Sequence, residues 1–159
     1  MSQPISLIRT IFLTGLLAGT LDILSACTQY FIKTGKHFSG VLTFVASGVF
    51  GQDAFTGNPV MPWLGLLFHY CIAMTWTVVF FLFYRYLPAD LKKRPLLTGP
   101  LYGLCVWLFM SFVVIPNSHV PHGNMRLVSA LIGLAIIMVM IGLPIVISAT
   151  RYYSRSTNS

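Results

Sequence analysis

Two ionisable residues, Asp22 and His69, each lie inside a long apolar stretch of the sequence. A charged side chain at the centre of a membrane costs about 2.5–3.5 kcal/mol on insertion scales, so such residues are candidates for function. A carboxylate beside an imidazole would offset part of this cost, and imidazole titrates near neutral pH. The pair is therefore suited to relaying a proton or binding a cation. The alternative is a single buried hydrogen bond that only fixes the alignment of two helices.

Further polar residues follow Asp22 at helical spacing. Ser25 and Gln29 lie three and seven residues after it, so all three share one face of a helix. If this helix begins near residue 7, Asp22 lies about nine residues, or roughly 13 Å, from its far end. His69 lies at a similar depth in the next apolar stretch. The spacing predicts a polar intramembrane centre at Asp22 and His69, with a polar stripe through Ser25 and Gln29 opening outward.

A second candidate site contains residue types that bind metals. His119, His122 and Met125 lie within one short polar segment, and His37 falls on the same predicted side of the membrane. Imidazole and thioether ligands suit copper or zinc. The alternative is an ordinary solvated turn, because Pro121 excludes a regular helix there. No cofactor is identified by the sequence; bound lipids are expected, and this metal site is a hypothesis.

The elements that must hold these residues follow from composition. The chain has 159 residues, of which 56% are hydrophobic and only 8% charged. A soluble domain carries about 25% charged residues, so the exterior of this chain must face lipid. About 20 consecutive apolar residues cross a bilayer, and such a segment must be helical. Residues 1–159 are therefore predicted to form one integral membrane domain, an all-α four-transmembrane-helix bundle with spans near residues 7–31, 60–84, 96–115 and 127–150.

Basic residues next to the spans set the orientation, since they are enriched on the cytoplasmic side. The side that holds both termini and the central loop carries Arg9, Arg85, Lys92, Lys93, Arg94, Arg151 and Arg155. The opposite side carries Lys33, Lys36 and Arg126. This bias predicts that both termini are cytoplasmic. Because the positive charge lies beside apolar spans, the expected partner is the lipid bilayer and not nucleic acid.

The segment from about residue 38 to residue 57 joins the first two spans. Its apolar residues recur at roughly helical spacing, but Gly48 and Gly51 and several polar residues interrupt them. It is also too short to span a membrane. The pattern predicts an interfacial or re-entrant amphipathic helix on the outer face, and a lid over a cavity is a narrower version of this hypothesis.

Small residues predict where helices approach closely. Gly15 and Gly19 are four residues apart in the first span, and Gly99 and Gly103 repeat the spacing in the third. Such pairs bring helix backbones together in membranes. The repetition is consistent with a duplicated helical hairpin, and these faces could also contact a second copy or a partner in a membrane complex.

Several motifs follow one another along the chain: Gly15-x-x-Ala18-Gly19-x-x-Asp22, Ser47-Gly48-x-x-Gly51-x-x-Ala54-Phe55-x-Gly57, His69, Tyr102-Gly103, Pro116-x-Ser118 and Gly142-Leu143-Pro144. Their order resembles that in a widespread group of small, uncharacterised four-helix bacterial inner-membrane proteins. The resemblance covers about residues 15 to 145 and implies a compact bundle in a bacterial inner membrane. The group has no established activity, so no functional residue is transferred from it.

Several common enzyme signatures are missing from the sequence: it has no phosphate-binding glycine loop, no paired histidines at i, i+4 helical spacing and no nucleophile elbow. An enzymatic function is therefore not indicated. The leading hypothesis is a multi-pass membrane protein that binds or transports an ion, a proton or a small molecule through Asp22 and His69. The alternative is a non-catalytic accessory or structural subunit of a larger membrane complex.

Overall fold

The computed structural model describes residues 6–121 and 127–157 of the chain, and within these ranges all regular secondary structure is helical. Four helices are long and apolar enough to cross a membrane: Leu7–Thr34, Met61–Tyr86, Pro95–Val114 and Leu127–Ser154. The predicted four-helix architecture is confirmed at this level. The chain has the build of a multi-pass membrane protein.

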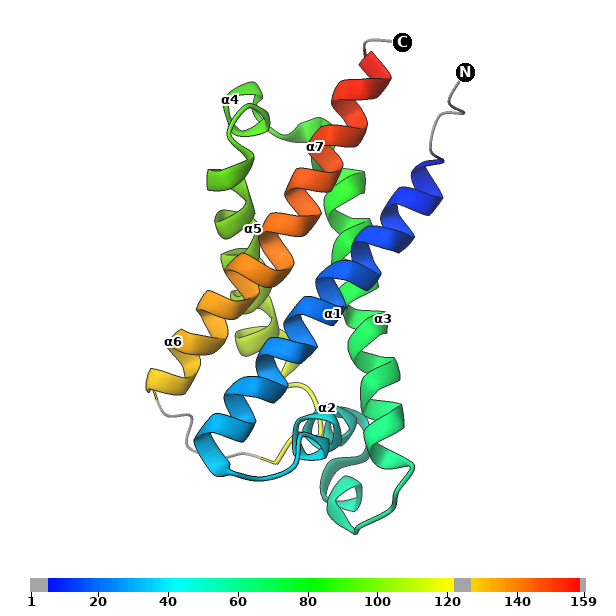
Figure 1. Ribbon diagram of the computed structural model, residues 1–159, viewed down its shortest axis with the longest axis vertical. Helices are drawn as coiled ribbons and strands as arrows, with labels where there is room; N and C mark the ends of the chain where they lie inside the picture. Colours follow the sequence, from blue (N-terminus) through cyan, green and yellow to red (C-terminus); the bar gives the residue numbers. More distant parts are fainter. Residues whose placement is uncertain (1–5, 122–126, 158–159) are drawn as a thin grey trace.

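The first span is α1 (Leu7–Thr34), and the second is α3 (Met61–Phe83) with the short 3-10 helix η2 (Tyr84–Tyr86). The third consists of α5 (Pro95–Phe109) and the π-helix η3 (Met110–Val114), and the fourth of α6 (Leu127–Ile136), the π-helix η4 (Ile137–Gly142) and α7 (Leu143–Thr157). Figure 1 shows that α1 begins and α7 ends at the same end of the bundle, next to the short helix α4 (Ala89–Lys92). We name this the terminal end, and the opposite end, which carries α2 (Ser39–Phe50), the α2 end.

The π-helical segments each end shortly before a proline. η3 stops two residues before Pro116, and η4 stops two residues before Pro144. Proline has no N–H to donate, and its ring clashes with the carbonyl of the preceding turn, so a regular α-helix is disrupted there. The sequence predicts a kink at Pro144, and the structure places a widened turn at Ile137–Gly142 just before it.

The core lies in the half of the bundle nearer the terminal end, where α1, α3 and α7 meet. Phe81, Ile145 and Ala149 are among its fully enclosed members. The rings of Tyr84 and Tyr153 stack with centroids 4.6 Å apart, which joins the last turns of the second and fourth spans. Large apolar side chains cover the exterior instead of polar ones, as expected for a surface that faces lipid.

Glycines set the closest helix contacts inside the chain. A Cβ at Gly15 or Gly19 would meet side chains of α3, and one at Gly99 or Gly103 would meet Leu143 or η4. Small residues allow this close approach of backbones. Because these faces are covered within the chain, they do not provide the free surface for a second copy or partner that the sequence suggested.

The segment between the first two spans folds as α2 followed by the 3-10 helix η1 (Gly51–Phe55). Ala46 and Ser47 are fully buried, and a Cβ at Gly65 of α3 would collide with the carbonyl of Leu42. The His119 backbone N–H also donates to the Gly48 carbonyl, at 3.0 Å. Helix α2 is therefore docked on α3 and on the loop that follows the third span.

Candidate functional site

Asp22 and His69 lie on α1 and α3, the two helices that the Gly15 and Gly19 contacts bring together. Both residues are half-buried, and they are close enough for their charges to interact. His69 is held by a 2.8 Å hydrogen bond between its Nε2 and the carbonyl oxygen of Gly19, one helical turn from Asp22. The direct hydrogen bond of His69 is thus to the backbone of α1.

The partner of His69 Nε2 determines the proton positions of the ring. A carbonyl oxygen only accepts hydrogen bonds, so Nε2 must carry the hydrogen. No described residue forms a hydrogen bond with Nδ1. In the neutral ring Nδ1 then keeps its lone pair, which points to no described hydrogen-bond donor and can accept a ligand.

The Asp22 carboxyl group accepts no hydrogen bond from any residue within 6–121 or 127–157. An ionised carboxylate without donors is costly at membrane depth. A positive charge on His69 or a bound cation would stabilise the charged form of Asp22. The arrangement can accommodate a proton or a small cation next to α3.

A second polar link lies one residue from the first on each helix. The hydroxyl groups of Thr20 and Tyr70 are 2.8 Å apart, and the Thr20 hydroxyl also donates to the Leu16 carbonyl at 2.7 Å. Since threonine has only one hydroxyl hydrogen, Tyr70 donates to Thr20. Sequence reasoning missed this pair; the only signal was its position beside the expected centre.

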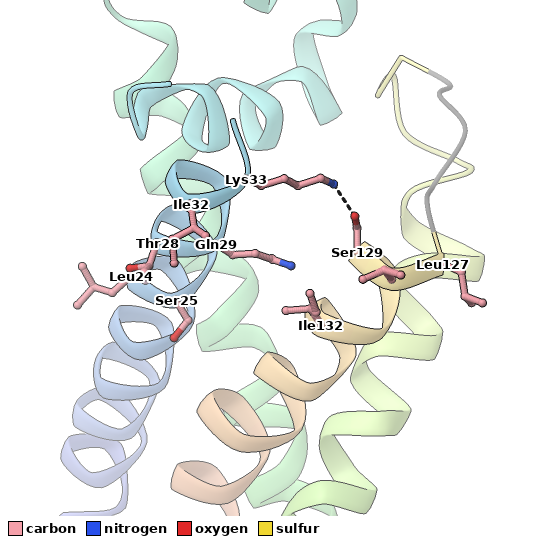
Figure 2. Close-up of a pocket in the computed structure, with 10 residues that line it drawn as sticks. Leu24, Ser25, Thr28, Gln29, Ile32, Lys33, Leu127, Ser129 and Ile132 are labelled. Carbon is pink, nitrogen blue, oxygen red and sulfur yellow. Dashed lines mark hydrogen bonds between the residues drawn. The ribbon is translucent and has the colours of Figure 1, made fainter. Parts of the chain in front are cut away.

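Ser25 and Gln29 line a groove that does not include Asp22. This groove has a volume of about 870 Å³ and lies between α1 and α6. Figure 2 shows Gln29 pointing into the gap between these two helices. The Ser25 hydroxyl donates to the Leu21 carbonyl of its own helix, at 2.8 Å. The groove is thus a separate feature, next to the polar centre along α1.

The structure does not assemble a metal site among the residues it describes. His37 and His119 are both exposed, and the described residues contain no group of three His, Cys, Asp or Glu that could hold an ion. His37 instead contacts Ser39 through Nδ1, at 3.3 Å. His122 and Met125 lie outside the described residues.

No protein-family model, curated protein or solved structure matches the chain. The case for a function therefore depends on the geometry at Asp22 and His69.

Proposed function

We propose that this membrane protein binds or transports a proton or a small cation through the pair formed by Asp22 and His69. The observation that carries the proposal is the combination of two unsatisfied groups. The Asp22 carboxyl has no hydrogen-bond donor, and His69 Nδ1 no partner, among the described residues. Both groups can exchange a proton or receive a ligand without breaking an existing bond.

The pair can hold one proton in two ways. In the neutral form the Asp22 carboxyl carries it and Nδ1 of His69 keeps a lone pair. Transfer of this proton to Nδ1 gives a carboxylate beside an imidazolium, with no change in total charge. A cation that binds the carboxylate would favour release of the Nδ1 proton, because two positive charges would otherwise lie side by side. Binding of a cation and loss of a proton are therefore coupled.

A purely structural role for Asp22 is less well supported. The alignment of α1 with α3 is already fixed by the packing at Gly19, by the bond from His69 to its carbonyl and by the Thr20–Tyr70 bond. None of these contacts uses the Asp22 side chain. Since an acidic residue is costly at this depth, its presence is better explained by a ligand than by packing.

The setting follows from the basic residues and from the resemblance described above. We place the chain in a bacterial cytoplasmic membrane with both termini inside, so that the α2 end faces outward and α2 covers the outer side of the bundle. Four helices enclose little volume. A continuous pathway would therefore be completed by a second copy or by another membrane protein.

The test is flux into liposomes that contain the purified full-length chain. Proton entry would be followed with an entrapped pH-sensitive dye, and Na⁺ entry with a Na⁺-sensitive dye. Asp22→Asn removes the carboxylate, and His69→Gln keeps an N–H that can donate to Gly19 while removing the titration. Asp53→Asn and His37→Gln are matched controls, because both residues are exposed and lie outside the four spans.

We expect wild-type flux of at least one ion above that of empty liposomes, and loss of this flux in Asp22→Asn and His69→Gln with the folded state preserved. Both controls should behave as wild type. Absence of wild-type flux of both ions would exclude transport by this chain on its own. Flux or ion binding by Asp22→Asn equal to that of wild type would refute the role of the pair.

A further inference from the structure

The groove between α1 and α6 opens at the α2 end of the bundle. Its walls come from the last three turns of α1 and the first turns of α6, as Figure 2 shows. Ile132 on α6 and Gln29 on α1 point toward one another across it. Its volume of about 870 Å³ is within the range of binding sites for small organic ligands, about 300–1,000 Å³.

The lining of the groove is mainly apolar. Leu24, Ile32, Leu127, Val128 and Ile132 form most of its surface, and they are also exposed on the outside of the bundle. From Leu24 to Lys33 the groove follows ten residues of α1, a rise of roughly 13 Å. One leaflet of the hydrocarbon core is about 15 Å thick, so the groove matches an acyl chain in both length and chemistry.

Among the described residues that line this apolar groove, Lys33 is the one with a charged side chain, and it lies at the mouth. The Lys33 ammonium donates to the Ser129 hydroxyl, across the gap from α1 to α6 (Figure 2). No carboxylate in the described part of the chain forms an ion pair with it. A lysine near the end of a membrane helix lies at the level of the lipid headgroups, where phosphate is the available counter-charge.

We propose that one anionic phospholipid binds in this groove, with an acyl chain between α1 and α6 and its phosphate on Lys33. The lipid belongs to the leaflet at the α2 end. An anionic headgroup fits better than a zwitterionic one, because no acidic residue at the mouth of the groove is available to pair with a headgroup ammonium. The site uses none of the atoms of the Asp22–His69 pair, so either proposal can fail without the other.

The test is native mass spectrometry of the delipidated full-length chain in detergent. The protein would be titrated with dioleoyl-phosphatidylglycerol, with dioleoyl-phosphatidylcholine and with glycerol phosphate, which has the headgroup chemistry without a tail. Lys33→Gln removes the cation at the groove. Lys36→Gln is its matched control, because Lys36 is also exposed but does not line the groove.

Two tryptophan substitutions test whether the lipid occupies the groove. Ile132→Trp would fill it from α6, while Leu131→Trp adds the same bulk at a neighbouring exposed residue outside the lining. We expect one tightly retained phosphatidylglycerol per chain. Lys33→Gln should weaken it about fivefold, as for one lysine at a membrane surface, and bring it to the level of phosphatidylcholine. Ile132→Trp should weaken both lipids, and the two control variants should bind as wild type.

Two outcomes would overturn the proposal. Equal losses in Lys33→Gln and Lys36→Gln would mean that only general positive charge attracts the lipid. Equal competition by glycerol phosphate and by the intact lipid would mean that the groove takes no acyl chain.

Discussion

The contact between α5 and the fourth span gives the sharpest test of the fold. Gly142, the last residue of η4, lies against the backbone of Gly99 and Gly103 on α5. A Cβ built at residue 142 would collide with the Gly99 carbonyl and lie 3.0 Å from the Gly103 nitrogen. These are backbone atoms, so no side-chain rotation can relieve the clash. In Gly142→Ala the two helices must separate.

Gly133, in the same span, provides the control position. A Cβ at Gly133 would meet nothing closer than the Trp107 indole nitrogen, at 3.9 Å, which is an ordinary contact. Overpacking of a well-packed contact costs about 1–3 kcal/mol. Replacement of an unconstrained helical glycine by alanine instead contributes up to about 1 kcal/mol of stability. We therefore expect Gly142→Ala to lower the free energy of unfolding by about 1–3 kcal/mol, and Gly133→Ala to leave it unchanged or raise it.

The assay is equilibrium unfolding in mixed micelles of a mild detergent and sodium dodecyl sulfate, followed by tryptophan fluorescence and circular dichroism. A cost of one or two kcal/mol changes the folded-to-unfolded ratio by a factor of about 5–30, which such titrations measure readily. Equal stabilities of Gly142→Ala and Gly133→Ala would refute the close contact of α5 with η4.

Three further predictions concern other parts of the chain. Tyr102→Phe removes the hydrogen bond to the Trp76 carbonyl and should lower the free energy of unfolding by about 0.5–1.5 kcal/mol in the same titration. Gly65→Ala should undock α2 from α3, seen as faster amide exchange in α2 with unchanged exchange in α5. For orientation, Asp90→Cys in a cysteine-free background should react with impermeant maleimide only from the cytoplasm, and Asp53→Cys only from outside; the reverse pattern would invert the proposed topology.

The four spans could be predicted because a membrane helix is determined by residues that are consecutive in the sequence. Length and hydropathy are properties of consecutive residues, and a bilayer accepts few alternatives to a helix. The helix between the first two spans could also be predicted, because its apolar residues recur at helical spacing. Its docking on α3 was not, because that contact depends on Gly65 meeting a carbonyl that lies 23 residues earlier in the chain.

The candidate site was predictable only in part. The rarity of ionisable residues in the spans singled out Asp22 and His69. The bond from His69 to Gly19, the Thr20–Tyr70 link and the groove all depend on how α1 is rotated and tilted against its neighbours. An even hydrophobic exterior carries little information about that rotation. The helical face shared by Asp22, Ser25 and Gln29 consequently gave no sign that Ser25 and Gln29 line a groove that does not include Asp22.

The glycines pack against other helices of the same chain, and this affects the alternative hypothesis that the protein is an accessory subunit. That hypothesis relied on small-residue faces as contacts for a partner, yet Gly15, Gly19, Gly99 and Gly103 are all used to close the bundle. A partner would have to bind the remaining exterior, whose large side chains are suited to lipid. The Asp22 carboxyl, in contrast, has no described hydrogen-bond partner that would give it a purely structural role. Within the described residues, glycines and aromatic rings account for the helix packing, and none of these contacts uses the Asp22 carboxyl, which is why we propose a binding role for it.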